Sequence, residues 1–156
     1  MAKFLTLNTH SWMEDEQKKK LDQLAERILQ EKYDVICLQE VNQEMESEQV
    51  VQAPFYHAVD GAIAIHKDHF AHCLVEKLVE KGLIYHWSWA YNHIGFDRFH
   101  EGVAILSLNP LKPRELLVSD ANDPTDYHTR KVLLAETEVD GRLVTVASCH
   151  LSWWNK

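Results

Sequence analysis

The spacing of hydrophobic and polar residues changes along the chain, and this change predicts the order of its helices and strands. Residues 3–8 and 33–38 are short, mostly apolar runs that are typical of buried strands. Between them, residues 15–33 carry apolar side chains at helical spacing, namely Leu21, Leu24, Ile28 and Leu29. A strand, a helix and a second strand of these lengths predict a βαβ-type unit whose two strands lie in one sheet.

A second helix is predicted over residues 67–81, where one apolar stripe precedes Gly82, a residue type that commonly follows a helix end. A polar loop beginning at Asn42 separates this helix from the strand before it. Beyond the helix the pattern is that of short strands, over residues 83–91, 102–108, 114–119, 131–139 and 142–151. Asp140–Gly141 joins the last two runs and is a strong hairpin signal. This order of elements predicts an α/β (α+β) fold in which sheet is layered against helices.

Length, composition and charge narrow the class of protein. The chain has 156 residues, 46% of them hydrophobic, which is enough for a single domain over residues 1–156 with one core. The formal net charge of −8 lowers the expectation of nucleic-acid binding through phosphates. It leaves that function open, because a bound divalent cation inverts the local field.

The cysteines and the apolar runs bear on the cellular compartment. Cys37, Cys73 and Cys149 are odd in number and widely spaced, so we expect buried free thiols in a reducing environment. The chain does not open with a charged leader and an apolar core, and no apolar run approaches ~20 residues. We therefore expect a cytoplasmic protein without a signal peptide or a transmembrane segment.

Four polar residues stand at the ends of apolar runs: Asn8, Glu40, Glu101 and His150. Each alone has a simpler explanation. Asn8 can cap a turn and Glu40 can start a loop, whereas Glu101 can be a solvated edge charge and His150 a core histidine. Together they favour a site, because sites in α/β sheets form at strand ends. Oxygen ligands and one imidazole at one sheet rim suit a hard divalent cation with an acid/base group.

The succession LTLNTHSW, DVICLQEV, EGVAILS and VASCHLSWW resembles the endonuclease/exonuclease/phosphatase superfamily. This is the metal-dependent phosphodiesterase fold of DNase I, abasic-site endonucleases and neutral sphingomyelinases. The resemblance implies a DNase I-like four-layer α/β/β/α sandwich, of which this chain covers the N-terminal part. The later motifs of the family, Gly-Asp-x-Asn and Asp-His, have no counterpart before Lys156. We therefore expect the C-terminal part to be absent and this chain alone to have little or no hydrolase activity.

The resemblance also implies residue roles in a Mg²⁺-dependent phosphoester hydrolase, with Mn²⁺ as an alternative metal. Glu40 matches the carboxylate that binds the metal, and Asn8 matches the asparagine that helps to hold it. Glu101 matches an acidic residue that pairs with a histidine, and His150 matches that histidine, which contacts the phosphate and can protonate the leaving group.

Two further residues are implied as substrate-binding. His10 stands where many members carry an aspartate, which leaves it a phosphate contact, and Arg130 is placed to reach the substrate phosphate. The substrate implied is a phosphoester, either a phospholipid head group as in the sphingomyelinase-like branch, a nucleic acid or a small metabolite.

Other functions remain open on the sequence. One is a non-catalytic binding domain that keeps the fold. Another is a zinc or thiol protein, built from His66, His69, His72 and Cys73. Helical histidines spaced by three drift around the axis, so a solvated face is the expected alternative. An uncovered sheet face would favour self-association.

Aromatic side chains gather in two places. One set is Trp87, Trp89, Tyr91, Phe96 and Phe99, and the other is Trp153 with Trp154. Core packing accounts for about half of them. The rest are expected to line a cleft or face a lipid interface, with residues 90–102 as a cleft wall.

Overall fold

The βαβ unit predicted at the start of the chain is present in the computed structural model, which describes residues 1–153. Strand β1 (Phe4–Asn8) is followed by a short 3₁₀ turn, η1 (His10–Trp12), helix α1 (Gln17–Glu31) and strand β2 (Val35–Glu44). The two strands are parallel neighbours, with Phe4 opposite Val35 and Asn8 opposite Gln39. A crossover helix is what brings two consecutive strands into parallel pairing.

The remaining strands form antiparallel pairs in two sheets. The first sheet has the order β1-β2-β4-β3, with β3 (His86–Gly95) and β4 (Phe99–Ser107) joined by a tight turn. The second sheet has the order β5-β6-β7, made of β5 (Leu111–Leu117), β6 (Lys131–Val139) and β7 (Arg142–Ser148). The predicted hairpin at Asp140–Gly141 is confirmed, and both residues have positive φ, as a two-residue hairpin turn requires.

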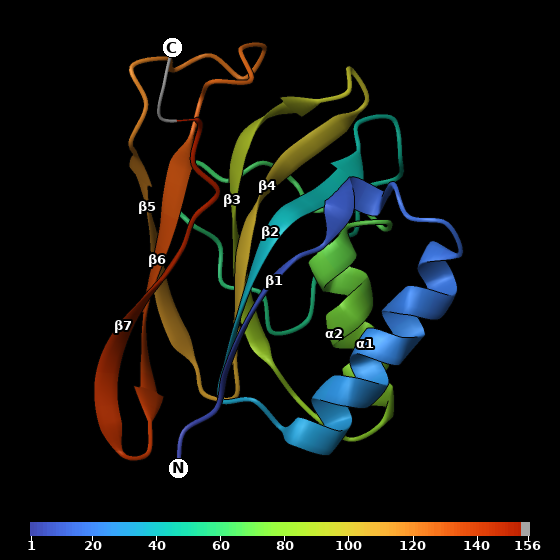
Figure 1. Ribbon diagram of the computed structural model, residues 1–156, viewed down its shortest axis with the longest axis vertical. Helices are drawn as coiled ribbons and strands as arrows, with labels where there is room; N and C mark the ends of the chain where they lie inside the picture. Colours follow the sequence, from blue (N-terminus) through green and yellow to red (C-terminus); the bar gives the residue numbers. More distant parts are fainter. Residues whose placement is uncertain (154–156) are drawn as a thin grey trace.

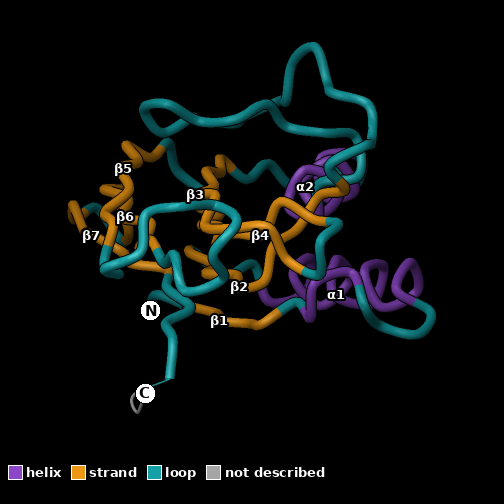
Figure 2. The backbone as a smooth tube through the Cα atoms, turned by 90° about the horizontal axis from the view of Figure 1, so that it is seen from above, coloured by secondary structure: helices purple, strands orange, loops and turns teal. Residues whose placement is uncertain are grey.

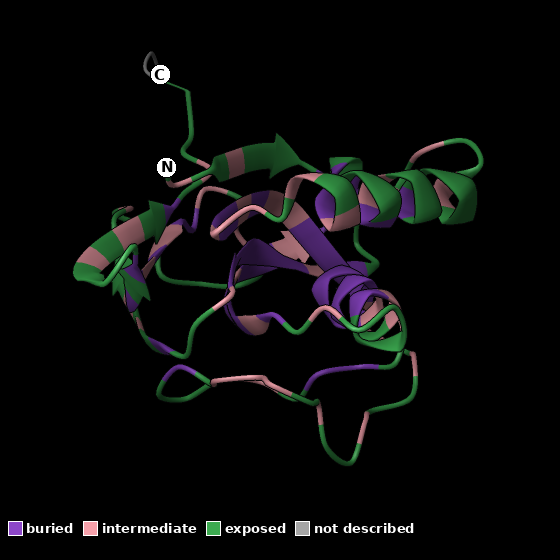
Figure 3. Ribbon diagram, turned by 90° about the horizontal axis from the view of Figure 1, so that it is seen from below, coloured by how far each residue is buried: buried purple, intermediate pink, exposed green. Residues whose placement is uncertain are grey.

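The layers are helices, first sheet and second sheet (Figure 1). Seen from above, the first sheet lies between the helices and β5–β7 (Figure 2). One core fills the space between the helices and the first sheet, and a smaller one, with Val103, Ile105 and Leu133, fills the space between the sheets. Burial is concentrated on these inner surfaces, whereas the outer surfaces are largely exposed (Figure 3). The α+β class is therefore confirmed.

Helix α2 (Phe70–Glu80) covers the first sheet and begins at an unusual cap. The buried His69 ring accepts a hydrogen bond from the backbone N–H of His72, in place of the Ser, Thr, Asp or Asn that normally caps a helix. The same ring packs edge-on against Trp89, at 4.6 Å between ring centroids. At the other end, Gly82 has a φ of +83° and terminates the helix as predicted.

Several sequence-based expectations were wrong. The loop expected from Asn42 begins only after Glu44, because β2 continues along β4 past an irregularity. The second helix starts at Phe70 rather than at residue 67. The histidines expected on a solvated face, His66, His69 and His72, are buried. The rings of His69 and His72 lie against Trp87 of the first sheet, and the His66 ring lies against His100.

The thiols are free, as expected, but Cys149 is exposed and the other two cysteines are only half-buried. Within residues 1–153, neither α1 nor α2 is long and apolar enough to cross a membrane. Trp154, part of the second aromatic set, lies outside the described residues.

Two β-bulges lie on either side of Gly102 in β4 and determine where polar side chains leave the first sheet. The register of β2 shifts between Leu38 and Val41, and that of β3 shifts between Tyr91 and His93. A Cβ on Gly102 would lie 2.1 Å from the Ala90 carbonyl oxygen, so no other residue fits there. A bulge inserts one extra residue and re-aims the side chains that follow it.

Burial of neutral histidine predicts acid sensitivity of the fold. Burial lowers the pKa of His69 well below its ordinary value, and burial also lowers the pKa of His72, His86 and His100. The unfolded chain therefore binds protons below about pH 6.5 that the native state does not. Stability should be fully present above that pH and should fall as the pH drops toward the native-state values.

We expect His69→Asn, which keeps a capping side chain but cannot titrate, to flatten this dependence by up to about 1.4 kcal/mol per pH unit. Urea unfolding between pH 5 and pH 8 measures it, with pH 8 as the reference where both states are neutral. If the free energy of unfolding depended on pH equally in His69→Asn and in the wild type, His69 would not be a source of the acid sensitivity.

Candidate functional site

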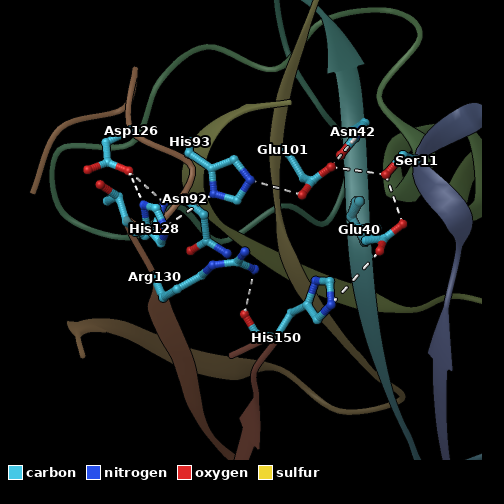
Figure 4. Close-up of polar contacts among 12 residues, drawn as sticks. Ser11, Glu40, Asn42, Asn92, His93, Glu101, Asp126, His128, Arg130 and His150 are labelled. Carbon is cyan, nitrogen blue, oxygen red and sulfur yellow. Dashed lines mark hydrogen bonds and ion pairs between the residues drawn. The ribbon is translucent and has the colours of Figure 1, made fainter. Parts of the chain in front are cut away.

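A pocket of about 590 Å³ lies where the turn between β3 and β4 approaches the ends of β6 and β7. Four of the six residues singled out from the sequence line it, namely Glu40, Glu101, Arg130 and His150. Glu40 comes from β2, Glu101 from β4, Arg130 from the residue before β6 and His150 from the segment after β7. Both sheets thus contribute charged groups to one cavity, and Figure 4 shows these side chains converging.

Glu40 reaches the pocket because of the bulge in β2. Its φ is +52°, in the left-handed region, where a long side chain is uncommon. Thr9 Oγ1 holds the bulge by donating to the Glu40 carbonyl oxygen at 2.8 Å. Glu40 is therefore not at the tip of a strand, as the sequence suggested, but at an irregularity inside one.

A buried hydroxyl connects the two carboxylates. Ser11 Oγ lies 2.9 Å from Glu40 Oε2 and 3.0 Å from Glu101 Oε1. A hydroxyl has one hydrogen, so it donates to one carboxylate at a time and presents a lone pair to the other. The charge on Glu40 and the charge on Glu101 are therefore coupled through Ser11, and a proton or cation near either carboxylate changes the bond that Ser11 makes.

Glu101 is paired with His93 rather than with His150. His93 Nε2 lies 3.1 Å from Glu101 Oε2, and His93 Nδ1 lies 3.1 Å from the Thr129 carbonyl oxygen. Since a carbonyl only accepts, the Nδ1 contact requires a hydrogen on Nδ1. Glu101 and His93 therefore form a buried carboxylate–imidazole pair. The expected Glu101–His150 pair is not formed, because the bulge in β3 places His93 directly opposite Glu101.

The pKa of Glu101 reflects a balance of these contacts. Burial alone would raise it, but hydrogen bonds from His93, Ser11 and Asn42 outweigh burial and hold the pKa below its ordinary value. Gly95 makes room for the carboxylate, because a Cβ there would lie 2.9 Å from Glu101 Oε1. Glu101 is therefore a carboxylate kept ionised inside the protein.

Arg130 and His150 form the opposite wall. Arg130 Nη1 donates to the His150 carbonyl oxygen at 3.0 Å, and the His150 ring lies 3.9 Å from Glu40 Oε1, beyond hydrogen-bond distance. Burial lowers the pKa of Arg130, while Glu101 and Glu40 act in the opposite direction. The buried Nε of Arg130 has no acceptor within the described residues.

Asn8 and His10 do not line this pocket. They border a separate depression with Trp12 and Glu14. The Asn8 side chain accepts from the His10 backbone N–H at 2.8 Å, and His10 Nδ1 lies 2.8 Å from Glu14 Oε1. Positive φ angles throughout η1 turn the chain so that Ser11, not His10, faces the carboxylates.

The sequence did not indicate two lining residues, Ser11 and Tyr127, or the pairing of His93 with Glu101. Nothing in the LTLNTHSW run marks Ser11, because its position depends on the η1 turn. His93 and Phe96 fall in the stretch expected to form a cleft wall, and both do line the pocket. Tyr127 lies in the acidic loop between β5 and β6, which had no assigned role.

The carboxylates of the pocket suit a hard divalent cation that takes few protein ligands. No group of three or more His, Cys, Asp or Glu within residues 1–153 could hold a metal ion. The cluster needed for the zinc alternative is thus not formed by these residues, and Cys73 Sγ donates to the Lys67 carbonyl oxygen instead. Mg²⁺ needs only one or two carboxylates plus water and substrate oxygens, and Glu40 Oε1, which lacks a close partner, fits that role.

Comparisons with known proteins assign the chain, with its two sheets and its pocket of carboxylate, imidazole and guanidinium groups, to a family. The model of the Endonuclease/Exonuclease/phosphatase family matches residues 12–155. The chain belongs to this family. Comparison with curated proteins gave no significant match.

Solved structures support the fold. A family protein from Leptotrichia buccalis C-1013-b is 30% identical, with a TM-score of 0.84 over 97% of this chain and 54% of that one. An endonuclease/exonuclease/phosphatase from Beutenbergia cavernae DSM 12333 is 18% identical, with a TM-score of 0.61 over 97% and 39%. D. rerio TDP2, complexed with a single-strand DNA product, is 14% identical, with a TM-score of 0.56 over 99% and 48%. This chain therefore spans about half the length of these structures.

Replacing Ser11 tests the buried contact between the carboxylates. In Ser11→Ala, Glu101 loses a donor that offsets its burial, so the pKa of Glu101 should rise. Because its folded-state pKa is held below the ordinary value of 4.5, the stabilising contribution exists above that value and is lost as the pH falls. We expect about 1–3 kcal/mol less stability at pH 7, and little difference near pH 3.

Carbon NMR titration of the glutamate carboxyls and denaturant unfolding measure both effects. The matched control is Ser47→Ala, which removes a hydroxyl bonded to Asp68 outside the pocket. An unchanged Glu101 titration in Ser11→Ala would refute the coupling.

Proposed function

We propose that this chain forms the substrate-phosphate and metal side of a divalent-cation-dependent phosphoester hydrolase. The observation that carries the proposal is the convergence of Glu40, Glu101, Arg130 and His150, drawn from two sheets, on one pocket. Family membership supports a hydrolase of the nuclease, phosphodiesterase or phosphatase kind. The assignment of roles to individual residues is part of the proposal.

The chemistry follows from the charge of the substrate. A phosphodiester repels nucleophiles, so its oxygens need positive groups around them. When bound, Mg²⁺ or Mn²⁺ would supply Lewis acidity toward a phosphoryl oxygen. Glu40 would hold the ion, the Arg130 guanidinium would bind a phosphate oxygen, and the His150 ring would donate to the phosphate or to the leaving oxygen.

Glu101 acts through its neighbours rather than as a ligand in this proposal. It is surrounded by His93, Ser11 and Asn42, which leaves little of it free for an ion. Its negative charge orients the His93 ring and attracts the Ser11 hydroxyl hydrogen, for which Glu40 competes. The roles of Asn8 and His10 in metal and substrate binding remain predictions from the resemblance, and the separate depression they border does not favour them.

Metal binding by Glu40 is the first test, and it does not depend on turnover. We expect Glu40→Gln to weaken Mn²⁺ binding at least tenfold, because an amide is a poorer ligand for a hard cation than a carboxylate. Electron paramagnetic resonance of free Mn²⁺ measures the affinity. Glu46→Gln, an exposed loop carboxylate, is the matched control and should bind normally. Equal affinity of Glu40→Gln and the wild type would refute the metal role.

Turnover is tested alongside binding, because the relatives with solved structures are about twice as long as the matched part. DNA, sphingomyelin and an aryl phosphodiester, each with Mg²⁺, cover the nucleic-acid, phospholipid and simple substrate classes. We expect little or no hydrolysis of any of them by this chain alone, and metal-dependent turnover would contradict that expectation.

Self-association is proposed for the outer face of the second sheet. Leu116 lies opposite Val132 on this face, with Leu134 two residues further along β6, and Leu116 is 50% exposed. Apolar patches on sheet faces favour association. We expect sedimentation to show concentration-dependent dimers that Leu116→Lys shifts toward monomer, while Leu143→Lys, opposite Glu138 at the far end of the hairpin, shifts them less. A clean monomer at all concentrations would contradict this.

A further inference from the structure

The rim of the pocket is aromatic, in contrast to its charged floor. Phe96, Tyr127 and Trp153 all line the cavity, and they are 67%, 50% and 76% exposed. They come from three separate segments: the β3–β4 turn, the loop before β6 and the segment after β7. Single exposed aromatic residues are common, but three around one polar pocket are a patch that calls for an explanation.

Phe96 is held in an unfavourable backbone conformation. Its φ is +54° and that of Asp97 is +51°, and the Arg98 N–H donates to the Gly95 carbonyl oxygen at 3.1 Å to close the turn. Turns with two positive φ angles strongly prefer Asn, Asp and Gly, and a bulky residue there is an outlier. A large apolar side chain that is both solvent-exposed and strained gives the fold no advantage, which points to a role in binding.

Tyr127 is oriented by its neighbour. Its ring packs on His128 with 4.0 Å between centroids, and His128 in turn bonds Asp126. A ring braced in this way loses little conformational freedom when a flat ligand packs against it.

We infer that the aromatic rim binds a planar ring carried by the phosphoester, so that the ligand class is a small nucleoside phosphate. The inference rests on the proposed function in one respect, that the floor of the pocket takes the phosphate. Arg130 and His150 would take the phosphate, and Phe96 with Tyr127 or Trp153 would stack on the base. A volume of about 590 Å³ lies in the range of small-molecule sites.

Charge favours a small ligand over a long polyanion or a membrane. The net charge is −8, and Asp97 lines the same cavity as Phe96. Long single strands need a basic groove that follows the backbone, and anionic lipid surfaces need a basic patch beside the aromatic residues. The described cation at this pocket is Arg130, with His150 beside it, which matches one phosphate group.

Binding of matched phosphate ligands to the 156-residue chain tests the inference. Calorimetry with Mg²⁺ compares adenosine 5′-monophosphate, ribose 5-phosphate and inorganic phosphate. We expect the nucleotide to bind at least tenfold more tightly than the sugar phosphate, because stacking adds to the same phosphate contact. Phe96→Ala should remove most of that difference and leave the affinity for ribose 5-phosphate unchanged.

Two further variants separate binding from folding. Phe96→Asn suits the left-handed turn, so it should raise the melting temperature while it abolishes the preference for the nucleotide. Phe96→Trp should retain the preference. Phe4→Ala, which removes a half-exposed phenylalanine on β1, is the matched control and should change neither.

The outcomes also distinguish this inference from the proposed function. Equal affinities for the nucleotide and the sugar phosphate, or no binding of either at millimolar concentration, would overturn it. So would binding to sphingomyelin vesicles that Phe96→Ala abolishes, because the rim would then serve a lipid surface. Ring preference with Mn²⁺ binding that Glu40→Gln leaves unchanged would remove only the proposed function, whereas loss of Mn²⁺ binding in Glu40→Gln without ring preference would remove only the inference.

Discussion

The negative charge of a buried carboxylate needs hydrogen-bond donors around it, and the pocket is built around one such carboxylate, Glu101. Its three partners come from different places: His93 from β3, Ser11 from η1 and Asn42 from β2. An ionised group left without partners in the interior would be neutralised instead. The contacts that keep Glu101 charged therefore also tie the β1–α1 connection to the centre of the first sheet.

The backbone makes this arrangement possible through irregularities rather than through regular strands. Bulges in β2 and β3 flank β4 at Gly102, and they direct Glu40 and His93 toward the same side as Glu101. Gly102 and Gly95 have no Cβ, and the arrangement requires this. A Cβ at Gly102 would collide with the Ala90 carbonyl, and one at Gly95 would collide with the Glu101 carboxylate. Features of this kind recur beside functional sites because they re-aim side chains without disturbing the sheet.

The pocket has a charged floor and an aromatic rim. The floor depends on both sheets, because Arg130 directly precedes β6 and His150 follows β7 of the second sheet, whereas the carboxylates belong to strands of the first. The rim depends on loops, where strain at Phe96 can be accepted as long as the sheets are stable. A family that acts on phosphoesters can keep one floor and vary the rim, which is where specificity for the remainder of the substrate would reside.

The sequence by itself determined the order of helices and strands, the βαβ unit, the hairpin at Asp140–Gly141 and the family. It also marked Glu40, Glu101 and His150, because they stand at the ends of apolar runs and such runs are local properties of a sequence, and the family resemblance implied Arg130. Only the tertiary structure decided that Ser11 joins the two carboxylates, that His93 replaces His150 beside Glu101, and that Asn8 and His10 face another depression. The physical reason is that a bulge or a left-handed turn shifts the facing of every later side chain, and its position is fixed by pairing with strands far away in the chain.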